Sequence, residues 1–147
     1  MTKLETRNSK LKNTPSSVIV PVRDFKDLDT WKLARSLRNL IYVLLKKLPV
    51  EERFALNGQL RRAVQSIGAN VAEGFGRYSY QENIQFCRQA RGSAYEVRDH
   101  LVTAADAKFI SEAEYAEADS LAQRVIQVLN GYIRATTKRQ TESRKSR

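Results

Sequence analysis

The sequence predicts an all-α protein built as an antiparallel up-down four-helix bundle. Its 147 residues include only six glycines and three prolines, so long intervals contain no helix breaker. Apolar residues recur at steps of three and four in four separate stretches, which is the spacing of a helix with one buried face. The connections between these stretches are short, as they are between the neighbouring helices of a bundle. A chain of this length is expected to form one domain with a real core.

The ends of the chain differ in composition from its middle. We expect a basic extended N-terminal arm at 1–23, the four-helix bundle at 24–137, and a basic C-terminal tail at 138–147. Within the arm, Val18–Val22 contains a proline among β-branched residues, a combination that disfavours helix. An extended segment of this kind could dock its valines on a groove.

The first helix is predicted to begin near Asp27, whose carboxylate can cap it, and to end at Pro49. Asp29 would lie in the first turn, where a negative charge suits the helix dipole. The stretch Leu40–Leu45 is apolar on every side of the helix. One core cannot absorb all of these side chains, so a second burial surface is expected.

The second helix is predicted to open at Glu51 and Glu52 and to run to about Gly76. Gly74 and Gly76 mark its end, where a left-handed residue would satisfy the last carbonyls. Its apolar face packs on the core, and a line of small residues would let another helix approach closely. That small line consists of Ala69, Ala72 and Gly76.

Serine caps predict the starts of the third and fourth helices. Ser79 is followed three residues later by Glu82, and Ser111 by Glu114, which is the spacing of a capping box. In the third helix, Cys87 falls on the core line and is expected to be a small buried hydrophobe. Off that line, the apolar side chains suggest a second contact surface. They are Phe86, Tyr95 and Val102.

The formal net charge of +10 is concentrated at the two ends. Residues 1–23 carry five basic residues against one acid, residues 138–147 carry five against one, and the remainder carries 16 against 14. Flexible basic arms favour a polyanionic partner, because each neutralised phosphate releases counterions. The alternative is that these arms are solvated tails that only keep the protein in solution.

Catalytic and metal-binding constellations are not found. His100 is the only histidine, and Glu96 precedes it by four residues rather than the three of a di-iron bundle motif. No cofactor and no metal are therefore expected, and the protein is predicted not to be an enzyme. The single cysteine favours a reducing compartment, and no apolar run is long enough to span a bilayer, so we expect a cytoplasmic protein without a membrane partner.

A polar stripe along the second helix is the most informative chemistry in the sequence. Two interpretations stay open: a buried network that fixes helix register, and arginine forks presented to phosphates. The network would join this stripe to the third helix through Gln59, Ser66, Asn70, Glu73, Ser93 and Glu96. The forks would be Arg61, Arg62 and Arg77.

Three stretches carry a resemblance to a known family. They are Asp24–Trp31, Gln59–Arg77 and Ala90–Glu96, and the middle one, QLRRAVQSIGANVAEGFGR, is long enough to be specific. In these stretches the chain resembles the four-helix-bundle family of 23S rRNA intervening-sequence proteins. It is also similar to accessory variability proteins of diversity-generating retroelements, which implies a homopentamer that binds nucleic acid and a reverse transcriptase. Gly68, where the family often has proline, and Arg91 depart from the family's pattern.

The functional prediction is a non-enzymatic, oligomeric helical bundle that binds RNA or other nucleic acid through phosphate contacts. The expected partners are other copies of the chain and a nucleic acid. The alternative is an accessory scaffold that docks a reverse transcriptase or another protein, with the surplus apolar faces as its partner surface. The residues expected to contact nucleic acid are Arg61, Arg62, Arg77, Arg91, Lys138 and Arg139.

Overall fold

The computed structural model describes residues 21–147, which form four long helices and two short 3-10 turns. The helices are α1 (Asp29–Leu45), α2 (Leu56–Gly76), α3 (Tyr80–Asp106) and α4 (Glu112–Lys145), and the turns are η1 (Phe25–Asp27) and η2 (Val50–Glu52). No strand occurs between residues 21 and 147. The prediction of a four-helix bundle is confirmed.

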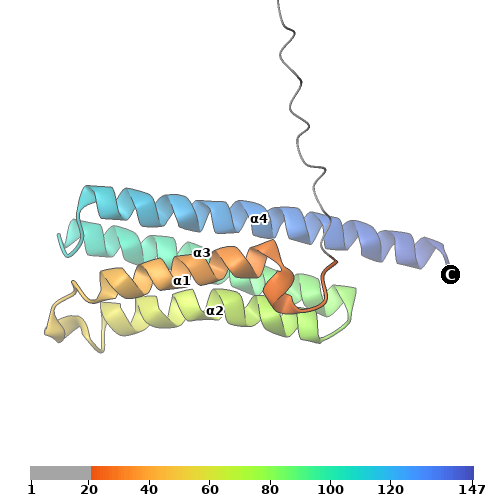
Figure 1. The fold of residues 1–147 in the computed structure, drawn as a ribbon, viewed down its shortest axis with the longest axis horizontal. Coiled ribbons are helices and arrows are strands. Elements are labelled where there is room, and N and C mark those ends of the chain that lie inside the picture. The colour runs from red at the N-terminus through yellow and green to blue at the C-terminus, as the bar shows by residue number, and fades with distance from the viewer. Residues whose placement is uncertain (1–20) are drawn as a thin grey trace, which may run out of the picture.

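The four helices lie side by side along one long axis (Figure 1). The α1–α2 and α3–α4 connections lie at one end of the bundle and the α2–α3 connection lies at the other. Of the N-terminal valines expected to dock on a groove, Val18 and Val20 lie in residues 1–20, outside the described part of the chain. None of the helices between residues 21 and 147 is long and apolar enough to cross a membrane.

The core is formed by the predicted apolar stripes of all four helices. Its largest fully buried side chains are Leu37 and Ile41 of α1, Leu60 and Ile67 of α2, Leu101 of α3, and Leu129 of α4. Cys87 is buried among them, as predicted, and burial raises the pKa of its thiol to about 11. The thiol is therefore protonated at neutral pH and is a poor nucleophile.

Two of the predicted helix starts are confirmed and two are wrong. The hydroxyls of Ser79 and Ser111 accept the backbone N–H groups of Glu82 and Glu114, as a cap requires. Asp27 instead belongs to η1, because its carboxylate accepts the N–H groups of Arg23 and Asp24, each at 3.0 Å. Glu51 and Glu52 form η2, and α2 starts only at Leu56.

α2 ends at Gly76, as predicted, but no glycine supplies the expected left-handed residue. No glycine between residues 21 and 147 has a positive φ; the left-handed residue after α2 is Tyr78, with φ 56°. Within residues 21–147, no helix packs closely on Gly76, where a Cβ would meet nothing within 4 Å, and Ala69 of the small line is exposed. Gly74 makes the close approach instead, because a Cβ there would lie 2.9 Å from the Cβ of Phe86 on α3.

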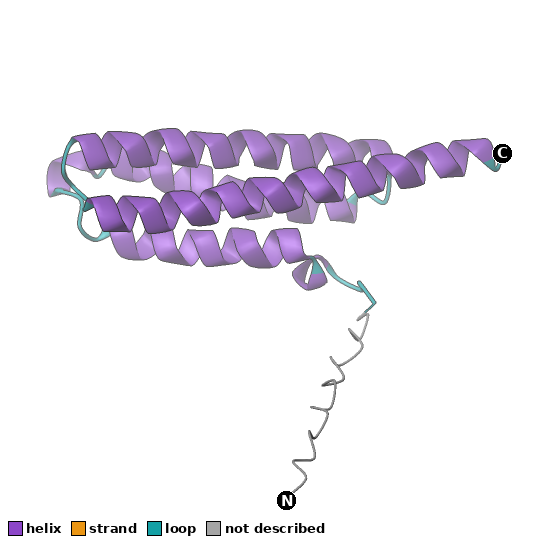
Figure 2. Ribbon diagram, turned by 90° about the horizontal axis from the view of Figure 1, so that it is seen from above, coloured by secondary structure: helices purple, strands orange, loops and turns teal. Residues whose placement is uncertain are grey.

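The C-terminal tail is helical rather than flexible. α4 continues without interruption through the expected boundary at residues 137 and 138 and ends at Lys145. Figure 2 shows its last turns projecting beyond the ends of the other helices. None of residues 137–147 is buried. We call residues 138–145 the α4 overhang.

The bundle absorbs part of the surplus apolar surface. Leu40 and Tyr42 of α1 are half-buried against the core, and Phe86 of α3 is half-buried beneath the guanidinium of Arg77. Val43, Tyr95 and Val102 remain exposed. An apolar surface outside the core is therefore present, but it is smaller than the sequence suggests.

Candidate nucleic-acid interface

Three residues of the predicted polar network meet between α2 and α3. The hydroxyls of Ser66 and Ser93 lie 2.9 Å apart, and the amide of Asn70 donates to the carbonyl of Ser66 at 2.9 Å and to its hydroxyl at 3.0 Å. All three side chains are half-buried. They satisfy one another across the helix pair, which is what a register-fixing network requires.

The other three predicted members do not join this network. Gln59 is exposed, Glu73 forms an ion pair with Arg77 at 2.9 Å, and Glu96 lies 3.2 Å from the ring of His100. Glu73 and Glu96 are exposed as well. Their longer side chains reach the solvent, whereas those of Ser66 and Asn70 end in the space between the helices.

The predicted arginines separate into those with internal partners and those facing solvent. The guanidinium of Arg91 donates to Asn130 of α4 at 2.8 Å and is half-buried. The hydrogen bond from Arg77 to Glu73 raises the pKa of Arg77 and occupies part of its fork. Arg91 and Arg77 therefore contribute to the bundle itself and are less available to phosphates.

Arg61 and Arg62 lie on the solvent side of α2. The guanidinium of Arg61 is 4.8 Å from the ring centroid of Tyr42 on α1, and the hydroxyl of Tyr42 accepts a hydrogen bond from Gln65. Arg62 is exposed and is not among the ion pairs found in residues 21–147. Both lie near the start of α2, at the opposite end of the bundle from the α4 overhang (Figure 1).

Lys138 and Arg139 are exposed on the α4 overhang, together with Arg144 and Lys145. Lys138 and Arg139 were predicted contacts, but the helix that carries all four residues was not predicted. A signal was present, since residues 138–145 read KRQTESRK and contain no glycine or proline. Apolar periodicity ends after Thr137 because the α4 overhang does not pack on the core, so periodicity could not reveal that the helix continues.

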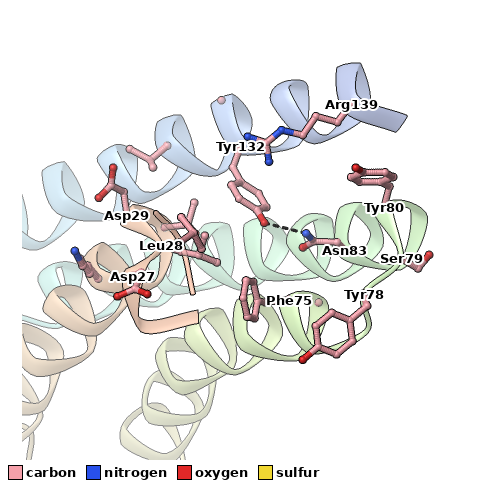
Figure 3. A pocket seen from close by; sticks show the side chains of 16 residues that line it. Asp27, Leu28, Asp29, Phe75, Tyr78, Ser79, Tyr80, Asn83, Tyr132 and Arg139 are labelled. Carbon is pink, nitrogen blue, oxygen red and sulfur yellow. Dashed lines mark hydrogen bonds between the residues drawn. The ribbon is translucent and has the colours of Figure 1, made fainter. Parts of the chain in front are cut away.

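A groove of about 1000 Å³ opens where the α2–α3 turn, the start of α1 and the late part of α4 converge. The amide of Asn83 donates to the hydroxyl of Tyr132 at 2.9 Å within it (Figure 3). Tyr78 and Tyr80 lie toward one end of the groove, and Asp27 and Asp29 lie toward the other. Its lining residues include Val22, Asp27, Asp29, Lys32, Phe75, Tyr78, Ser79, Tyr80, Asn83, Tyr132 and Arg139.

The charges in this groove are not equivalent. The backbone N–H groups of Arg23 and Asp24 lower the pKa of Asp27, so this carboxylate is ionised but already hydrogen-bonded. Lys32 and Arg139 are exposed. No group of three or more histidine, cysteine or acidic residues that could hold a metal occurs between residues 21 and 147.

Comparison with known proteins identifies the family. The family model of the 23S rRNA-intervening sequence protein matches residues 26–131. The chain belongs to the 23S rRNA-intervening sequence protein family. The family match runs from η1 through most of α4 and ends before the α4 overhang.

A solved structure shares the fold. It is the crystal structure of a protein of unknown function from the S23 ribosomal protein family of Bacteroides thetaiotaomicron, with a TM-score of 0.66 and 23% sequence identity. The alignment covers 71% of this chain and 97% of that one. No curated protein matches the sequence.

Gly68, one of the two departures from the family's pattern, does not interrupt α2. This residue lies inside the helix, and a Cβ placed on it would be 3.5 Å from the indole nitrogen of Trp31, an ordinary contact distance. Gly68 therefore lies where α1 and α2 pack, in this member of the 23S rRNA-intervening sequence family.

Proposed function

We propose that this protein is a non-enzymatic oligomeric bundle that binds RNA or another nucleic acid through phosphate contacts. The observation that carries the proposal is the α4 overhang, a helical extension without buried residues that holds four basic residues against one acid. The description of the family as 23S rRNA-intervening sequence proteins is consistent with an RNA partner.

The dimensions of this segment suit a nucleic-acid backbone. Residues 138–145 span about 10 Å along the helix axis at 1.5 Å per residue. This length corresponds to about three nucleotides of one strand in a B-form duplex, at about 3.4 Å each. Lys138 and Lys145 are seven residues apart and lie on one side of the helix, where both can reach neighbouring phosphates, while Arg139 and Arg144 lie on other sides. Such contacts supply affinity without reading the base sequence.

The test is a salt titration of RNA binding by the full chain and by a chain ending at Thr137. We expect salt-sensitive binding by the full chain to a duplex RNA of about 20 base pairs. Deletion of residues 138–147 should reduce the slope of log affinity against log salt by about 2–4, since each lost phosphate contact contributes about 0.9. Urea unfolding of both chains checks that the bundle is intact, which we expect because none of the removed residues is buried.

A matched variant at the other end of the bundle locates the contact. Arg61→Gln combined with Arg62→Gln removes two exposed charges from α2 and leaves the α4 overhang unchanged. A smaller loss of affinity than the truncation causes would support the overhang as the main contact. Binding that is absent at low salt, or equal in slope for the full and shortened chains, would contradict the proposal.

The second candidate is an accessory scaffold that docks a reverse transcriptase or another protein. It is favoured by the exposed apolar side chains of Val43, Tyr95 and Val102.

The same side chains could instead form contacts between copies in a homopentamer of up-down bundles, which is the assembly that we propose. Sedimentation at micromolar concentration tests the assembly, and a monomer would contradict it. If the chain that ends at Thr137 no longer binds nucleic acid but still binds a protein partner, the result supports the scaffold function.

A further inference from the structure

Tyr78 combines a costly backbone conformation with an exposed ring. Its φ of 56° is in the left-handed region, where the Cβ of any residue other than glycine crowds the backbone. The residue lies just beyond the end of α2, where glycine is the usual choice. Its side chain is 92% exposed, so the ring gains almost no packing inside the chain. The fold would lose nothing if glycine stood here.

Strained residues cluster at functional sites, but Lys108 has the same left-handed backbone after α3, so the strain alone does not single out Tyr78. What distinguishes Tyr78 is a large aromatic ring that is exposed beside a groove. The other tyrosine of the α2–α3 turn, Tyr80, is also exposed, and both line the groove at the end of the bundle. Figure 3 shows them at the opposite end of the groove from Asp27 and Asp29. The side chain of Arg139 extends from the α4 overhang toward Tyr132 in the same view. The groove therefore combines exposed aromatic surface at Tyr78 and Tyr80 with a cation, Arg139, whose side chain lies toward Tyr132.

We propose that this tyrosine end of the groove holds an unpaired base of a single-stranded nucleic acid, with Tyr78 as the stacking platform. The inference rests on the proposed nucleic-acid binding and names the strand form that the protein prefers. Unpaired bases expose their faces to aromatic side chains, whereas bases within a duplex are already stacked on their neighbours. Arg139 and the rest of the α4 overhang are placed to hold phosphates of the same strand.

Tyr78→Gly tests the stacking and should preserve the fold. The variant removes the ring and also the strain of a Cβ at positive φ, so the midpoint of urea unfolding should stay the same or rise. The probes are a mixed-sequence single-stranded RNA of about 12 nucleotides and its duplex, measured by fluorescence anisotropy at one salt concentration. We expect affinity for the single strand to fall by about 5- to 100-fold, the range for loss of one stacked base. Affinity for the duplex should change less than about twofold.

Two control variants separate stacking from other effects. Phe54→Ala removes an aromatic ring that is 93% exposed at the other end of α2, and it should leave both affinities unchanged. Tyr78→Phe keeps the ring and should keep the single-strand affinity. In a single strand that contains 2-aminopurine, the fluorescence of this base should be quenched on binding to the parent protein and to Tyr78→Phe, but not to Tyr78→Gly.

The outcomes distinguish this inference from the proposed function. Salt-sensitive binding that Tyr78→Gly does not weaken would overturn the stacking site and leave phosphate binding standing. An equal loss for single strand and duplex, or a change in sedimentation, would also overturn the stacking site. Absence of binding to either probe at low salt would overturn both proposals.

Discussion

Thr30 has a buried hydroxyl without a partner in the described part of the chain. Its side chain is 1% exposed, and no hydrogen bond reaches its Oγ1 atom. A buried polar group that is left unpaired costs about 1–3 kcal/mol. Thr30→Val replaces the hydroxyl by a methyl group of similar size. We expect the free energy of unfolding to rise by about 1 kcal/mol in urea denaturation.

Thr136→Val is the matched control for this prediction. Thr136 is 2% exposed, but its hydroxyl donates to the carbonyl of Tyr132 at 2.8 Å. Its replacement removes a hydrogen bond and should leave stability unchanged or lower it. If Thr30→Val is as destabilising as Thr136→Val, the Thr30 hydroxyl has a partner in solution and the prediction is wrong.

Residue spacing predicted only part of the candidate site. Ser66 and Asn70 are four apart on one helix, so their hydrogen bond follows from helix geometry. The contact of Arg61 with Tyr42 joins two helices whose rotation no single-chain spacing specifies. The sequence offers Tyr78 and Tyr80 as clustered aromatic residues, but whether such rings pack at a helix junction or face solvent depends on the backbone of the turn, and the left-handed Tyr78 is exposed.

At the scale of elements, Gly74 sets the separation of α2 and α3. A Cβ there would lie 2.9 Å from the Cβ of Phe86 and 3.0 Å from the side-chain oxygen of Asn83. Gly74→Ala must push the helices apart, and we expect a loss of about 1–3 kcal/mol in unfolding free energy. Gly76→Ala, where the Cβ meets nothing within 4 Å, should be neutral or stabilising by up to about 1 kcal/mol. Equal stability of the two variants would show that α3 does not pack closely on Gly74.

The pair of Arg98 and Asp119 joins α3 to α4. The guanidinium of Arg98 donates to Asp119 at 2.8 Å, and Gln123 donates to the same carboxylate at 2.7 Å. Burial pushes the pKa of Asp119 upward, but these hydrogen bonds outweigh it, and the net pKa lies below the ordinary 3.8. A depressed pKa in the folded protein contributes stability above the unfolded value of about 3.8, and this contribution disappears as pH falls through the folded value.

Asp119→Asn should therefore destabilise the protein by about 1–3 kcal/mol at pH 7. The difference from the parent protein should shrink in urea unfolding as pH falls below about 3.8, where Asp119 of the unfolded chain becomes protonated, and should be smallest below the lower folded pKa. Glu73→Gln, which breaks the exposed pair with Arg77, should cost less than about 0.5 kcal/mol. A pH-independent effect of Asp119→Asn would rule out the ion pair as its cause.

Helix boundaries were predictable where a short side chain caps the backbone directly. Ser79 and Ser111 fit that rule, and both caps form. Asp27, Glu51 and Glu52 also stand before apolar runs, yet they lie in 3-10 turns. 3-10 turns are frequent just before α-helices, and acidic residues are favourable at a helix start, so composition could not separate the two.

At the scale of the whole molecule, the fold was predictable because burial repeats at helical spacing in all four stretches. The distribution of charge in space was not. The two exposed groups of predicted arginines and lysines lie at opposite ends of a long bundle, with Arg61 and Arg62 at one end and Lys138 and Arg139 at the other. A single phosphate site formed by all six predicted contacts is therefore excluded within one chain.

The helical continuation of α4 changes the entropy of binding. A flexible tail loses about 1–2 kcal/mol for each residue that a partner orders, which for ten residues would offset most of the attraction between its charges and a phosphate backbone. The basic residues of the α4 overhang are already fixed relative to one another before any partner arrives. The overhang can thus meet a partner as a rigid rod, and only its side chains need to become ordered.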